Sequence, residues 1–134
     1  MHKLILSLVA GVAGLLVSHA AERPSVDLTK IPPASDKKGL TYAKDIKPIF
    51  EKSCFKCHGE EKQKGQLRFD SLEATLNGGE NGKVVEPGKS DKSVILIGVA
   101  RLDPDSAMPP ADKGDPLTKE QIGLIRAWIE QGAK

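Results

Sequence analysis

The stretch SCFKCHGE, Ser53 to Glu60, contains both cysteines of the chain, Cys54 and Cys57, and places His58 directly after the second. The whole chain has 134 residues, of which 39% are hydrophobic and 4% aromatic, enough for one small domain. A domain of this size buries only a modest share of its own surface, which leaves room for a bound group to complete the core. The formal net charge of +2 argues against nucleic acid as a partner.

The N-terminus has the pattern of an export signal. Residues 1–3 include a lysine, Leu4 to Val17 form an apolar run, and residues 18–20 place small side chains where a signal peptidase cleaves. The run is shorter than the ~20 residues that span a bilayer. We therefore predict a signal peptide over residues 1–20, cleavage near Ala20, a periplasmic or otherwise extracytoplasmic protein, and no stable membrane span after cleavage.

Removal of this signal leaves few candidate ligands for a metal. His2 and His19 leave with it, so His58 is the remaining histidine and Met108 the remaining methionine. Residues 21–40 are polar and contain prolines, without helical or strand periodicity, and we predict a linker that is either a tether or an irregular collar.

Residues 41–134 are predicted to form an all-α domain, because helical periodicity recurs and no alternating pattern indicates a sheet. The first predicted helix is capped by Asp45 and has Pro48 in its first turn, where a missing N–H is tolerated. Its spacing places Cys54 and Cys57 on the apolar face.

Three further helices are predicted. The second covers residues 71–77 and the third residues 91–100. The last begins at a capping box of Thr118 and Gln121, ends at Gly132 and packs against the first helix. Its predicted buried stripe consists of Ile122, Ile125, Trp128 and Ile129.

Three common roles of a cysteine pair do not fit this sequence. A disulfide across two residues would constrain the unfolded chain little, and thioredoxin-like pairs occur in a βαβ context that is missing here. A structural zinc site needs four protein ligands, whereas Cys54, Cys57 and His58 supply three. The remaining interpretation of C-x-x-C-H is covalent attachment of one haem c. The two thiols would form thioethers with the porphyrin, and the His58 imidazole would bind its iron.

Met108 is the soft candidate for a sixth ligand of this iron. Pro109 and Pro110 follow it and restrict the backbone, which would pre-position a weakly binding thioether. The alternative is that Met108 fills a gap in the core.

From Thr41 to Ala133 the chain resembles the planctomycete-type cytochrome c domain. The resemblance rests on the segments DIKPIFEKSCFKCHG, LRFDSLEATLNGGENGKVVEPGKSDKSVIL, MPP and LTKEQIGLIRAWIEQGA. It implies a small helical monohaem fold, with thioethers at Cys54 and Cys57, His58 as the proximal ligand and Met108 at the position of the family's methionine.

Two surface features have open interpretations. The glycine-rich segment 77–83 either forms a tight loop over one haem edge or is a surface turn. Residues 44–64 contain six lysines against four acidic residues. This excess either steers an acidic redox partner or is a solvated helix face.

We expect an electron carrier rather than an enzyme, because the one remaining histidine is assigned to iron and no catalytic set of residues is visible. Its expected partners are redox proteins: an exported dehydrogenase, a quinol-oxidising complex or a terminal oxidase. One alternative is a haem sensor or peroxide-handling enzyme in which Met108 dissociates. Another is a docking module that keeps its haem only to hold its fold.

Overall fold

The computed structural model describes residues 25–134, so the predicted signal peptide lies outside the described residues. Within them the chain is helical and has no strand beyond isolated bridges, which confirms the all-α prediction. The α-helices are α1 (Lys47–Ser53), α2 (Leu72–Asn77), α3 (Ile95–Val99) and α4 (Lys119–Glu130). A π-helical segment, Tyr42–Ile46, leads into α1. Short 3₁₀ segments cover Leu28–Lys30, Lys64–Gln66, Ser90–Lys92 and Pro104–Ser106.

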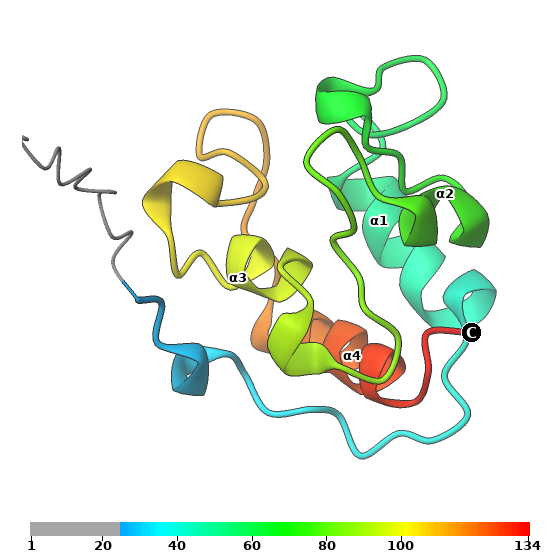
Figure 1. The fold of residues 1–134 in the computed structure, drawn as a ribbon, viewed down its shortest axis with the longest axis vertical. Coiled ribbons are helices and arrows are strands. Elements are labelled where there is room, and N and C mark those ends of the chain that lie inside the picture. Colours follow the sequence, from blue (N-terminus) through cyan, green and yellow to red (C-terminus); the bar gives the residue numbers. More distant parts are fainter. Residues whose placement is uncertain (1–24) are drawn as a thin grey trace, which may run out of the picture.

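Buried residues of α1, α3 and α4 belong to one hydrophobic core cluster, and Figure 1 shows how the helices are arranged. In this view α1 and α2 lie on one side, α3 on the other, and α4 below them. None of the helices in the described part of the chain is long and apolar enough to cross a membrane.

The first helix differs from the prediction at both ends. Its cap is Thr41, whose hydroxyl accepts from the Lys44 N–H, while the Asp45 carboxylate reaches back to the Thr41 N–H at 2.9 Å. Asp45 therefore does not cap α1 and lies inside the preceding π-turn. The helix also ends before the cysteines, because the Phe50 carbonyl accepts from both Cys54 and Phe55 N–H groups and widens the last turn.

The last helix forms as predicted. The Thr118 hydroxyl accepts from the Gln121 N–H at 3.1 Å, and the Gln121 side chain accepts from the Thr118 N–H at 2.9 Å, a complete capping box. Its apolar stripe is buried, with Trp128 at 0% exposure. Trp128 lies 6.2 Å from the ring of Tyr42, so α4 packs against the start of the first helical segment.

The two middle helices were predicted with different success. α2 begins and ends where expected, capped by Ser71. The predicted helix over 91–100 is interrupted at Ser93, which has an extended backbone. The buried Ser93 hydroxyl accepts from the Glu86 N–H at 2.9 Å and donates to the Lys89 carbonyl at 2.9 Å. These bonds offer the backbone an alternative to helix, which explains the break.

Residues 25–40, here called the collar, follow the outside of α4 (Figure 1). The Arg126 guanidinium donates to the carbonyls of Ile31 and Pro32, and the Ser35 N–H donates to the Gly123 carbonyl at 3.0 Å. A Cβ atom at Gly123 would lie 2.8 Å from the Pro33 carbonyl oxygen. The collar backbone is thus packed directly onto α4. The division of the chain into signal, linker and domain stays a prediction.

Candidate functional site

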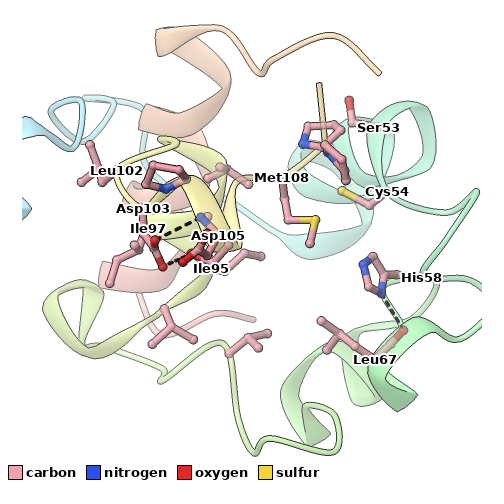
Figure 2. Close-up of a pocket in the computed structure, with 18 of the residues that line it drawn as sticks. Ser53, Cys54, His58, Leu67, Ile95, Ile97, Leu102, Asp103, Asp105 and Met108 are labelled. Carbon is pink, nitrogen blue, oxygen red and sulfur yellow. Dashed lines mark hydrogen bonds between the residues drawn. The ribbon is translucent and has the colours of Figure 1, made fainter. Parts of the chain in front are cut away.

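One cavity brings together all the site residues that the sequence predicts. It measures about 1170 Å³ and is lined by Cys54, Cys57, His58 and Met108. In Figure 2 the Cys54 sulfur, the His58 ring and the Met108 thioether are directed into the same space. Much of the remaining wall is apolar and includes Leu67, Val84, Val94, Ile95, Ile97 and Leu102.

The cysteines lie in a single turn after α1. The Cys57 and His58 N–H groups both donate to the Cys54 carbonyl, at 3.1 and 2.9 Å. The turn is tight, since a Cβ atom at Gly59 would lie 2.6 Å from the Phe55 carbonyl oxygen. Both cysteines are free thiols, and burial raises the pKa of Cys54 to about 12. The turn therefore presents two free thiols along one wall of the cavity, rather than a disulfide.

The His58 ring is oriented by a backbone acceptor. Its Nδ1 lies 3.2 Å from the Leu67 carbonyl oxygen (Figure 2), and because a carbonyl only accepts, Nδ1 carries the proton. The other nitrogen, Nε2, then has a free lone pair, which makes it the ring atom available to bind a metal. The rings of Phe69 and His58 pack edge to face with their centroids 5.6 Å apart, and the Phe69 N–H donates to the His58 carbonyl at 2.8 Å.

The opposite wall holds Met108 on a loop beside α3. The Met108 N–H donates to the Gly98 carbonyl at 3.0 Å, and Arg101 Nη1 donates to the Pro109 carbonyl at 2.6 Å. The loop is closed on itself by Asp103, whose carboxylate accepts from the Asp105 N–H and the Ser106 hydroxyl. Met108 is 39% exposed, which does not fit the alternative of a gap-filling core residue.

Sequence reasoning missed several parts of this site. The Leu67 acceptor is a main-chain atom and has no residue-type signal. The role of Arg101 depends on where α3 ends. The collar also contributes to the wall, through Ser25, Val26, Asp27 and Lys30. The glycine-rich loop 77–83 folds back through paired hydrogen bonds between Gly79 and Gly82, and its Asn81 lines the cavity.

The comparison with protein families matches the part of the chain that holds this cavity. Residues 54–112 match the family model Planctomycete cytochrome C. The match begins at Cys54 and extends past Met108, and it confirms the predicted resemblance. Searches of the curated proteins and of the solved structures found no match.

The family match indicates a haem-binding electron carrier, and a cytochrome c domain implies one covalently attached haem c with its iron. Such domains generally work outside the cytoplasm. The cavity fits this cofactor: its walls are largely apolar, two thiols lie one turn apart, and a histidine has Nε2 free for a metal. The thioether comes from the opposite wall.

Proposed function

We propose that this protein is an exported monohaem c-type cytochrome that transfers single electrons, with His58 and Met108 as the axial ligands of the iron. The observation that carries the proposal is the shared cavity. Two thiols and an imidazole come from one turn, a thioether comes from a loop far along the chain, and all four side chains line one space.

The chain's own residues account for attachment. The Cys54 and Cys57 thiols would each add across one vinyl group, so that a carbon–sulfur bond forms and the thiol hydrogen goes to the neighbouring vinyl carbon. The Leu67 carbonyl keeps the proton on His58 Nδ1 and holds the ring orientation while Nε2 binds.

The same residues favour electron transfer. Haem, when bound, supplies an iron that cycles between the ferric and ferrous states. A His and Met ligand pair raises the reduction potential, and the apolar wall of Val94, Ile95 and Ile97 disfavours the more charged ferric state. These effects suit a carrier that accepts electrons from an exported dehydrogenase or a quinol-oxidising complex and passes them on, for instance to a terminal oxidase.

The surface around the cysteine turn supports a partner of opposite charge. Its lysines are all exposed, which leaves their charges free to attract an acidic redox protein. They are Lys44, Lys47, Lys52, Lys56, Lys62 and Lys64.

Denaturing electrophoresis tests the attachment. The exported protein should keep haem that solvent cannot extract, and replacement of both Cys54 and Cys57 by Ala should abolish the covalent haem stain. A stain that survives the double replacement would show that attachment lies elsewhere.

Binding of carbon monoxide distinguishes an electron carrier from a haem sensor or peroxide-handling enzyme. A carrier whose Met108 stays bound should resist carbon monoxide in the ferrous state. Rapid binding by the wild-type protein would favour a sensor or peroxide-handling enzyme, in which Met108 leaves the iron.

A further inference from the structure

The end of α3 carries an arginine where helices usually place glycine. After Val99 and Ala100 the chain turns at Arg101, whose φ is 56°, in the left-handed region that glycine adopts most easily. The Arg101 N–H donates to the Gly98 carbonyl at 3.0 Å, and the Leu102 N–H donates to the Ile97 carbonyl at 3.1 Å. This pair of bonds is a Schellman motif, and Arg101 occupies its glycine position.

The end of α4 provides an internal comparison. There Gly132, with φ 101°, stands at the same position of the same motif. Its N–H donates to the Ile129 carbonyl at 3.0 Å, and the Ala133 N–H donates to the Trp128 carbonyl at 2.9 Å. One chain thus ends two helices by the same device, once with glycine and once with arginine. The helix end alone does not explain the arginine.

The Arg101 side chain supplies the explanation. Its Nη1 donates to the carbonyl of Pro109, the residue directly after Met108. The Met108 N–H is bound to the Gly98 carbonyl, which also accepts from the Arg101 N–H. Met108 is therefore held on both sides by the end of α3.

The segment directly after Met108 offers no backbone donors. Pro109 and Pro110 have no N–H groups, so the backbone directly after Met108 cannot donate hydrogen bonds of its own. A cationic guanidinium forms a stronger bond to a carbonyl than a neutral donor does. We propose that Arg101 is a positioning residue that keeps the Met108 thioether at the haem iron. This inference rests on the proposed axial role of Met108.

Two substitutions of the holoprotein separate the side chain from the helix end. Arg101→Met removes the donor and keeps a strained left-handed residue, whereas Arg101→Gly removes the donor and relieves the strain. The glycine variant should therefore unfold at higher urea concentration than the methionine variant. Both should bind carbon monoxide faster than wild type in the ferrous state, by about tenfold or more, the factor expected for loss of one hydrogen bond to a charged group. Both should also weaken the long-wavelength ferric absorption of sulfur-ligated haem.

Gly132→Ala is the matched control. It introduces a side chain into the left-handed position of α4, where the nearest atom outside the turn is Lys134 Cε at 3.8 Å. It should lower stability and leave the carbon monoxide rate and the absorption band unchanged.

The outcomes distinguish the inference from the function on which it rests. A wild-type protein that lacks the band and binds carbon monoxide freely would overturn Met108 ligation and this inference together. A wild-type protein with the band, and Arg101→Gly equal to it in both measurements, would overturn the inference alone. The same holds if the carbon monoxide rates of all variants follow their stabilities, Gly132→Ala included.

Discussion

Met108 joins two properties that a weak ligand needs: access to the cavity and a fixed backbone. Its side chain is 39% exposed and lines the cavity, while its N–H is bound to the Gly98 carbonyl. A thioether is neutral and binds iron less strongly than an imidazole, so the position of its loop would decide how long the proposed ligand stays bound.

Replacement of Met108 by Ala tests its assignment directly. The long-wavelength ferric band should disappear, carbon monoxide should bind readily, and the reduction potential should fall, because the thioether that raises it is gone. The haem should remain covalently attached, as a haem-stained gel would show. An unchanged spectrum and potential would mean that another group is the sixth ligand.

Cys54 should react slowly in the folded, haem-free chain. Burial raises the pKa of its thiol from 9.0 to about 12, so the reactive thiolate is about a thousandfold rarer at neutral pH. Alkylation followed by mass spectrometry should show slow labelling of Cys54 when folded and fast labelling in urea. Since the unfolded chain loses this proton at lower pH, the free energy of unfolding should fall as the pH rises from 9.0 towards 12. Equal labelling rates in both states would contradict this burial.

Residue chemistry explains what the sequence revealed at this scale and what it did not. Cysteine, histidine and methionine are recognisable ligands wherever they stand, so the four predicted side chains could be found without coordinates. The Leu67 acceptor belongs to the main chain, and Arg101 matters only because α3 ends two residues before it. Neither has a local signal.

At the scale of the elements, helix ends were predicted correctly where both hydrogen-bonding partners lie close together in the sequence. The capping box of α4 and the Ser71 cap of α2 use bonds between residues three apart, so the sequence contains both partners. The break at Ser93 depends on Glu86, which lies outside the helical segment. The predicted start of the first helix was wrong because Thr41 and Asp45 exchange hydrogen bonds across a π-turn. Hydrophobic periodicity does not reveal such a turn.

The capping box should contribute to stability without touching the site. Thr118→Ala removes the acceptor for the Gln121 N–H and should lower the free energy of unfolding by about 1 kcal/mol, measured by urea titration of the holoprotein. Thr118→Ser keeps the hydroxyl and should lose much less. The absorption spectrum should be unchanged in both, and an equal loss in both would argue against the cap as the cause.

At the scale of the whole molecule, the cavity lies between the cysteine turn that follows α1 and the loop beside α3, with the collar at its margin. The predicted all-α fold class is confirmed for the described residues. The packing of residues 25–40 was not predictable in detail, because their contacts to Gly123 and Arg126 join segments about ninety residues apart and no periodic pattern marks them.

The direction in which Gly123→Ala changes the free energy of unfolding tests whether the collar is packed against α4. Gly123→Ala should stabilise an isolated helix by up to about 1 kcal/mol. In this fold the new Cβ would lie 2.8 Å from the Pro33 carbonyl oxygen, so we expect a net destabilisation of about 1–3 kcal/mol as the collar backbone shifts. Urea unfolding of the holoprotein gives the sign, and limited proteolysis should cut residues 25–40 faster in the variant. A more stable variant would indicate a tether that leaves α4 free.

The bond from His58 to the Leu67 carbonyl also determines how much electron density the proposed axial ring can give to its metal. A carboxylate acceptor would draw the proton away from Nδ1 and give the ring imidazolate character, which stabilises ferric iron. The carbonyl carries no net charge and leaves the proton on the ring. Because this acceptor is part of the main chain, any amino acid at position 67 supplies it. A substitution at position 67 therefore leaves the hydrogen-bond acceptor in place and preserves the electronic character of the His58 ring.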